Sequence, residues 1–298
     1  MGSYPCHPQA TSARGRLRYI GLVLDFIGGS GWKRRRVVDR AVLAVALLVA
    51  SGLRGDGAGP GNAAPDAHSL AGAPPIVLWA WEEPEDLRTA DPAHVGVAFL
   101  AERVFVGSKV EIVRRHQRIL TPGSIWAEAV IRIEATRAFE DNATTRRAAA
   151  DAVLQAAHLP GIRGVQIDFD ATAQQRAFYA EVLRQVRAAL PAGEHLEITA
   201  LVSWCAQPQS WIHALPVDLA VPMNFRLGEH VGAWVVREPL CAGATGISTD
   251  EPEGQASALA ATPVQKRTVF LFAPLPWTAD QLAALNRGNV PHDRRGAR

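Results

Sequence analysis

The stretch GVQIDFDA, residues 164–171, alternates apolar and polar side chains in the manner of a β-strand. Successive side chains of a strand point to opposite faces, so positions 165, 167 and 169 form an apolar face. The opposite face carries Gln166, Asp168 and Asp170. A strand with these two faces predicts a sheet that packs against helices on one side and lines a polar interior on the other.

Seven further apolar stretches predict strands around this one, and three amphipathic stretches predict helices between them. The strands are expected at residues 76–81, 95–106, 126–135, 196–203, 217–225, 244–249 and 268–273, and the helices at 144–158, 173–189 and 278–286. Alternating strands and helices require a mainly parallel sheet, and about eight strands favour a closed (β/α)₈ TIM-like barrel over an open sheet. No clear helix follows the second or the sixth strand, so we expect irregularity there.

The barrel is expected to occupy residues 75–287. Residues 1–53 have the layout of an export signal or signal anchor, because a basic cluster precedes an apolar run at 41–53 that is short for a bilayer span. Residues 54–74 are typical of a flexible linker, and residues 288–298 of a disordered tail. These features predict a periplasmic or extracellular protein. The alternative is a protein that residues 41–53 anchor in the membrane, facing the periplasm.

The composition and motifs exclude several function classes. The 298-residue chain carries a formal net charge of only +2, which gives no basis for nucleic-acid binding. The sequence has no GxSxG, GxGxxG or phosphate-binding loop, and its histidines lack the spacing of metal ligands. We therefore expect neither a cofactor nor a metal ion.

The carboxylates of the 164–171 stretch are the main candidates for chemistry. Barrel enzymes place their sites at the C-terminal ends of the strands, where Asp170 would be more accessible than Asp168. Two carboxylates in a partly desolvated interior repel each other, which raises the pKa of at least one and suits a general acid. Alternatively, Arg132 and Glu134 of the preceding strand join Asp168 and Gln166 in a satisfied buried network. An Asp-x-Asp metal site of a sugar transferase is a weaker possibility, because the pair lies in a strand and the chain carries an export signal.

Aromatic side chains near the predicted strand ends suggest a site for a sugar ring. Trp79 and Trp81 share one face of the first strand, and Glu82 follows them at its end. Trp204 and Trp277 also follow strand ends. Sugar rings stack on aromatic side chains, so these four tryptophans and Glu82 are candidates for substrate binding.

Two further features fall in the predicted loops at the barrel mouth. Asp250, in the acidic stretch STDEPEG after the seventh strand, could act as a base or nucleophile opposite Asp170. Cys205 and Cys241 each follow a predicted strand and could join two loops in a disulfide; two unlinked buried thiols are the alternative.

Residues 164–170 resemble the strand-four motif of the chitinase-like glycoside hydrolases, in which alternating aspartates lead to a terminal glutamate acid. The resemblance implies that Asp170 takes the place of the acid and that Asp168 orients the substrate or the acid. Gln166 stands where that family has a further aspartate. The triplet Met223-Asn224-Phe225 is similar to the Met-x-Tyr of strand six in that superfamily, which implies substrate binding by Asn224.

Over roughly residues 75–280 the chain resembles a bacterial envelope family catalogued as domain of unknown function three-one-four-two, through stretches such as WAWEEPEDLR and LPVDLAVPMNFRLG. The two resemblances lead to one hypothesis: a glycoside hydrolase-like protein that acts on an envelope or extracellular polysaccharide, with Asp170 as general acid. The alternative is a non-catalytic saccharide-binding pseudoenzyme of the cell envelope, because Asp170 and Gln166 depart from the hydrolase motif. The sequence leaves open whether the protein is an enzyme.

Overall fold

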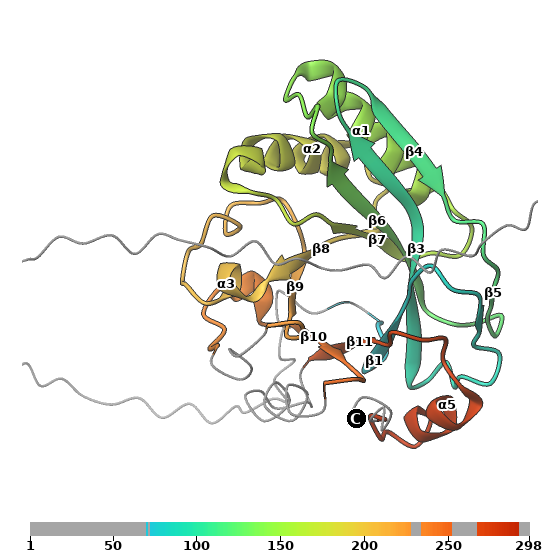
Figure 1. Ribbon diagram of the computed structural model, residues 1–298. Helices are drawn as coiled ribbons and strands as arrows, with labels where there is room; N and C mark the ends of the chain where they lie inside the picture. The colour runs from blue at the N-terminus through green and yellow to red at the C-terminus, as the bar shows by residue number, and fades with distance from the viewer. Residues whose placement is uncertain (1–69, 71, 228–233, 252–266, 292–298) are drawn as a thin grey trace, which may run out of the picture. The chain divides into compact units, whose positions relative to one another are not determined.

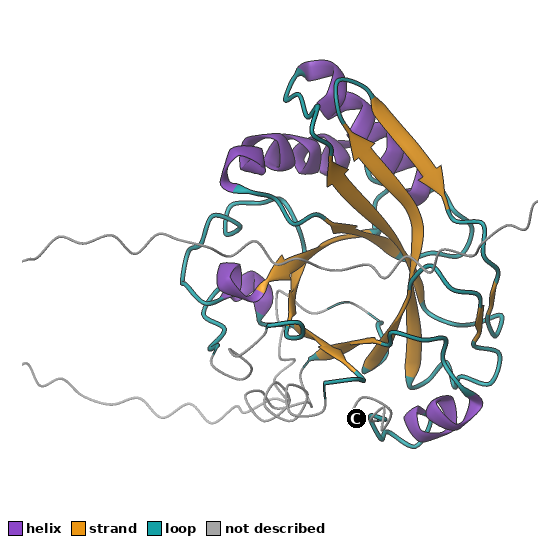
Figure 2. Cartoon of the chain, viewed as in Figure 1, coloured by secondary structure: helices purple, strands orange, loops and turns teal. Residues whose placement is uncertain are grey.

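Eight parallel strands close into a barrel in the computed structural model, which describes residues 70, 72–227, 234–251 and 267–291 (Figure 1). The strands follow one another around the ring as β1, β3, β6, β7, β8, β9, β10 and β11, and β1 pairs with both β3 and β11. Their bounds are Ile76–Ala80, Val95–Val106, Ala127–Ala135, Gly164–Asp168, His195–Leu201, Leu219–Met223, Ala244–Ser248 and Thr268–Phe272. Figure 2 shows this ring of strands. The predicted TIM-like barrel is confirmed.

The described residues fall within one compact unit of the chain, Pro60–Arg298. The predicted export signal at 1–53, most of the linker at 54–74 and most of the tail at 288–298 lie outside the described residues. Within the described part of the chain, no helix is long and apolar enough to cross a membrane.

Helices form where the sequence predicts them. α1, Ala143–Ala157, connects β6 to β7, and α2, Arg176–Ala189, connects β7 to β8 after a 3₁₀ turn, η1, at Ala173–Gln175. α5, Ala279–Leu285, follows β11, and a short α3, Val202–Cys205, follows β8. α1 and α5 begin at side-chain caps: Asn142 accepts a hydrogen bond from the backbone N–H of Thr145, and Thr278 from that of Gln281. Such caps satisfy amides that lack partners in the first turn.

After β3, where the sequence predicts no clear helix, the chain forms further strands. The second half of β3 pairs in antiparallel fashion with β4, Val110–Arg114, and a separate short pair joins β2, Glu85–Asp86, to β5, Ile119–Leu120. β1 contacts β3 only as far as Phe99, whereas β6 accompanies β3 to Val106. Residues 102–106 of β3, with β4 and the end of β6, therefore extend beyond the ring beside α1 (Figure 1). We call this extension the β3–β4–β6 wall.

The connection after β9 is the second irregular one. Its described residues form only a 3₁₀ turn, η3, at Pro239–Cys241. The irregularity expected after the second and sixth strands is thus observed at both places in the described residues.

The apolar face of β7 packs outward, as predicted. Val165, Ile167 and Phe169 are buried in the layer between the barrel and the helices α1 and α2. The ring of Phe169 meets that of Tyr179 on α2 edge-on at 5.2 Å between centroids. A second outer layer, which includes Trp277, packs between β1, β11 and α5. Because both layers cover the outside of the barrel, the other face of each strand is left to line the interior.

A disulfide joins the loops that follow two neighbouring strands. Cys205 at the end of α3 and Cys241 at the end of η3 are bonded, with their Cα atoms 5.8 Å apart, and both are fully buried. The backbone N–H groups of Arg237 and Glu238 donate to the carbonyl oxygen of Cys205, which fixes the same loops to each other.

We expect replacement of both cysteines by serine to lower the unfolding free energy by roughly 4 kcal/mol, because the bond closes a loop of 36 residues in the unfolded chain. Urea unfolding in a Cys6→Ser background measures the loss. Reductant should shift the parent protein to the stability of the double variant and leave the variant itself unaffected. Equal midpoints for the oxidised parent and the variant would show that the bond does not form in solution.

Candidate functional site

Two aspartates at the C-terminal end of β7 differ sharply in exposure. The alternation in residues 164–171 predicted that Asp170 belongs to the strand, but β7 ends at Asp168, so Asp170 lies two residues beyond it. Asp168 is only 3% exposed and accepts hydrogen bonds from Arg132 Nη1 and, at 2.7 Å, from Thr199 Oγ1. The side chain of Asp170 is 41% exposed, and its Oδ2 lies 4.0 Å from Arg132 Nη2. Of the two carboxylates, Asp170 is therefore the one that solvent or a ligand can reach.

The surroundings of Asp170 favour its protonated form. Partial burial, followed by the charge of Asp168, raises the pKa of Asp170 to about 6, and Arg132 opposes this shift. Asp168, in contrast, is hydrogen-bonded by a guanidinium and a hydroxyl. Neighbouring carboxyl groups in such different environments can take different protonation states, which is what acid catalysis requires.

A chain of ion pairs runs along the ends of four neighbouring strands. Arg132 Nε lies 3.4 Å from Glu134 Oε1, and the same oxygen is 2.6 Å from Arg103 Nη2. Arg103 Nη1 lies 2.9 Å from Glu82 Oε1. With the pair of Arg132 and Asp168, the connected side chains span β1, β3, β6 and β7. The structure thus brings together Glu82, Glu134, Arg132 and Asp168, all of which the sequence pointed to.

Arg103 is the member of this chain that sequence reasoning missed. A bulge between Leu100 and Glu102 shifts the register of β3 against β6. Strict alternation from Ala98, which faces the interior, would place Arg103 on the outer face of β3 and Val104 inside. After the bulge Val104 is buried in the outer layer instead, and Arg103 pairs in register with Arg132.

Below this layer the barrel interior holds a buried polar cluster. Gln166 Oε1 accepts a hydrogen bond of 2.7 Å from Trp79 Nε1, and its Nε2 donates to Glu128 Oε1 at 3.2 Å and to Glu197 Oε2 at 3.3 Å. Both glutamates are completely buried. Sequence reasoning missed this pair, although Glu128 lies on the same strand face as Arg132, and Glu197 on the same face as Thr199.

Burial sets the protonation of this pair. It raises the pKa of Glu197 to about 7 and that of Glu128 well above its ordinary value, with the charge of Glu197 adding to the shift of Glu128. Glu128 Oε2 and Glu197 Oε1 have no hydrogen-bond donor among the described residues. A proton held between the two carboxyl groups accounts for both observations.

Aromatic side chains cover the interior between this cluster and the mouth. Trp79 is buried inside the barrel and meets Phe225 edge-on at 6.0 Å between centroids; Phe225 in turn stacks on Phe272 at 5.5 Å. Gly246 leaves room for Trp79, because a Cβ there would lie 2.7 Å from its Cη2 atom. Trp81 is partly buried and packs against the same cluster. Neither phenylalanine was among the predicted binding residues.

The other two predicted tryptophans do not lie with Trp79 and Trp81. Trp204 is buried outside the barrel, where it packs edge-on against Trp211 at 4.8 Å between centroids. Trp277 is buried in the outer layer beside α5. α3 begins directly after β8, so Trp204 falls on the buried face of a helix rather than on an open loop. The prediction that Trp204 and Trp277 lie at the barrel mouth is therefore wrong, whereas sugar binding by Trp79 and Trp81 stays a prediction.

Asp250 and Asn224 lie just beyond the ends of β10 and β9, and each forms polar contacts with nearby residues. Asp250 Oδ2 lies 3.0 Å from Arg226 Nη2, and Asp250 Oδ1 accepts from the hydroxyl of Ser248. Asn224 donates from Nδ2 to Thr245 Oγ1 at 2.8 Å. For Asp250 to act as a base, its pairing with Arg226 would have to loosen.

The described residues contain no group of three or more His, Cys, Asp or Glu side chains that could hold a metal ion.

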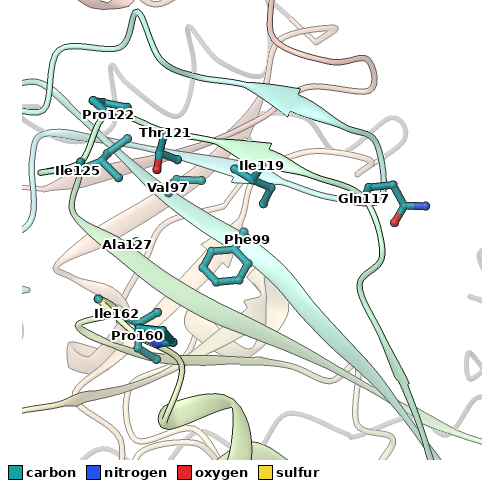
Figure 3. A pocket seen from close by; sticks show the side chains of 12 residues that line it. Val97, Phe99, Gln117, Ile119, Thr121, Pro122, Ile125, Ala127, Pro160 and Ile162 are labelled. Atoms are coloured by element: carbon teal, nitrogen blue, oxygen red, sulfur yellow. The ribbon is translucent and has the colours of Figure 1, made fainter.

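A pocket of about 390 Å³ lies outside the barrel (Figure 3). Its lining includes Val97, Phe99, Ile119, Ala127 and Ile162. Ala127 begins β6, so the pocket lies beside the N-terminal ends of the strands, at the opposite end of the barrel from Asp170.

Residues 127–219 match the family described as Domain of unknown function (DUF3142). This segment runs from β6 to the first residue of β9 and includes Arg132, Gln166, Asp168 and Asp170. The match confirms the resemblance to this family that the sequence suggested. None of the curated proteins matches the chain.

Four chains among the solved structures match this protein. One of them is the spore cortex-lytic enzyme SleL of Bacillus cereus, with 18% sequence identity and a TM-score of 0.37. The match covers 72% of this chain and 58% of that chain, so this protein spans less than two thirds of the length of SleL.

The buried glutamate pair makes stability depend on pH. Carboxyl groups whose pKa is raised on folding bind protons more tightly in the folded state, so stability falls as the pH rises from about 4.5 through about 7. We expect the unfolding free energy to decrease from about pH 5 to about pH 9. Glu128→Gln should reduce this decrease, because an amide can still donate to Glu197 without needing a proton.

Urea unfolding at several pH values measures the effect, with Glu111→Gln, a change of an exposed glutamate, as the matched control. Some pH dependence should remain in Glu128→Gln, because burial also raises the pKa values of Glu85 and Glu102 to about 7. Parallel profiles for the wild type and Glu128→Gln would contradict the shared proton.

Proposed function

We propose that this protein is a glycosidase-like hydrolase that acts on an envelope or extracellular polysaccharide, with Asp170 as the general acid. The observation that carries the proposal is the contrast between the two aspartates of β7. Asp170 is 41% exposed and has a pKa of about 6, whereas Asp168 is buried and bonded to Arg132 and Thr199. An accessible acid beside a fixed carboxylate at the C-terminal rim of a barrel suits the cleavage of a glycosidic bond.

In the proposed reaction, protonated Asp170 gives its proton to the glycosidic oxygen as the bond from that oxygen to the anomeric carbon breaks. The negative charge of Asp168 lies close enough to favour the positive charge that develops on the sugar ring. Water supplies the hydroxyl group of the product, and Glu82 or Asp250 is the candidate to activate it. Trp81, partly buried at the mouth, offers a face on which a sugar ring can stack.

We further propose that the protein works in the periplasm or outside the cell. The export signal or anchor expected in residues 1–53 supports this location. The disulfide between Cys205 and Cys241 supports it independently, because such bonds persist mainly in oxidising compartments.

Asp170→Asn should lower kcat by about 10²- to 10⁴-fold, the range typical of a lost general acid. In the wild type, kcat should fall as the pH rises through about 6, because Asp170 is then losing the proton that it must donate. A panel of nitrophenyl glycosides identifies a cleaved sugar, and pH–rate profiles follow. Asp151→Asn, on the exposed side of α1, is the matched control. Unchanged turnover by Asp170→Asn would rule out its role as the acid.

A second candidate is a non-catalytic saccharide-binding protein. The observation that favours it is that Asp168, Glu82 and Asp250 each form an ion pair with an arginine, so the possible partners of Asp170 are all engaged.

For this candidate we expect glycan binding that weakens about tenfold in Trp81→Ala, since one aromatic contact contributes on the order of 1 kcal/mol. Binding should persist in Asp170→Asn, and no bound glycan should be cleaved. Calorimetry combined with product analysis separates the candidates, because any turnover that is lost in Asp170→Asn excludes the binding protein.

A further inference from the structure

The two faces of the β3–β4–β6 wall differ in how well they are covered. On the face towards α1, Val104 and Val106 of β3 are fully buried, although Ile112 of β4 is 38% exposed. On the other face Phe105 is partly exposed, and Val113 of β4 is 50% exposed. Among the described residues, Phe105 and Val113 belong to none of the buried apolar clusters. The wall therefore presents a partly exposed aromatic ring and a half-exposed aliphatic side chain outside the buried apolar layers.

Strand register places these side chains directly beside the candidate site. Phe105 pairs with Glu134, and Arg103 pairs with Arg132 across the junction of β3 and β6. Val113 lies opposite Arg103 across the junction with β4. Paired residues in neighbouring strands point to the same face, so this surface continues without a break into the ion-pair chain that ends at Asp168.

A charged group lies over the aromatic ring. The guanidinium carbon of Arg103 lies 5.2 Å from the centre of the Phe105 ring, and Arg103 is held there by Glu82 and Glu134. An aromatic side chain beside fixed donors and acceptors matches a pyranose, which has an apolar face and a rim of hydroxyl groups. A wholly apolar face would instead suit another protein chain.

We propose that this face of the β3–β4–β6 wall, formed by Arg103, Phe105, Val113 and Glu134, is a further saccharide subsite. It binds another sugar residue of the same glycan whose glycosidic bond lies at Asp170. This inference rests on the proposed function, and it adds that the protein recognises a chain of sugars rather than a single terminal residue.

The spacing of the strands supports a subsite for a separate sugar. β3 lies two strands from β7, which corresponds to about 10 Å between their backbones. One ring cannot stack on Phe105 and also place its glycosidic oxygen at Asp170 over this distance. A ligand that uses both places must therefore be an oligosaccharide, so longer chains should bind and react better than single sugars.

The experiment compares substrate lengths in the full chain. The probes are the nitrophenyl glycosides of glucose and N-acetylglucosamine and of their β-linked trimers. For the wild type, kcat/KM should be higher for a trimer than for its monomer. In Phe105→Ala this trimer-to-monomer ratio should fall about tenfold, mainly through KM, because one aromatic contact is lost. Phe105→Tyr keeps the ring and should keep the ratio.

Leu159→Ala is the matched control, because it removes an apolar side chain that is 39% exposed and follows α1 at the other end of the barrel. Circular dichroism and thermal unfolding check that Phe105→Ala is folded. A wild type that cleaves both lengths, with an unchanged ratio in Phe105→Ala, would overturn the subsite and leave the proposed hydrolase intact.

If the wild type cleaves none of these probes, the hydrolase proposal fails for them, and calorimetry with the free trimers decides on the subsite. Weaker trimer binding by folded Phe105→Ala, with normal binding by Leu159→Ala, supports it. Equal binding by Phe105→Ala and wild type, or no binding by the wild type, overturns it.

Discussion

The pairing of β1 with both β3 and β11 closes the sheet, and this closure governs what the interior can contain. An eight-stranded barrel is just wide enough for its inward side chains to fill. Polar groups inside must therefore find partners among themselves. Gln166 accepts a hydrogen bond from the indole N–H of Trp79 and donates to two buried glutamates, whose pKa values burial raises. Below the mouth, ordinary ionised glutamates would be costly, so burial shifts their pKa values upwards.

Burial decreases towards the C-terminal rim of the barrel. The candidate chemistry depends on this change in burial between Asp168 and Asp170. Asp168, the last residue of β7, is still buried and is held by Arg132 and Thr199. Asp170 has left the strand, so solvent reaches it, but burial and the nearby charge of Asp168 still raise its pKa to about 6. Two residues of chain thus separate a fixed carboxylate from one that can exchange a proton. Arg132 contacts both carboxylates, because it donates a hydrogen bond to Asp168 and lies 4.0 Å from Asp170.

A single backbone irregularity extends the site beyond the ring. The bulge after Leu100 reverses the parity of β3, so that Arg103 faces the ion-pair chain while Val104 packs under α1. Without the extra residue, Arg103 would be turned towards the helices, and the wall would expose valine instead. A bulge of this kind re-aims side chains next to functional sites. The charged link from Glu82 to Asp168 and the partly exposed ring of Phe105 both depend on it.

The amino-acid sequence determined the eight barrel strands, the helices α1, α2 and α5 and the two-faced character of β7, because alternation and local propensity act over a few neighbouring residues. Those same patterns placed Gln166 and Asp168 inside and Phe169 outside, as observed. Only the tertiary structure decided which groups meet: Glu128 with Glu197, Arg103 with Glu134, and Trp204 with the outer layer instead of the mouth. Such contacts join strands that are distant in sequence, and they depend on register, a bulge and the exact start of a helix, none of which hydrophobic periodicity encodes.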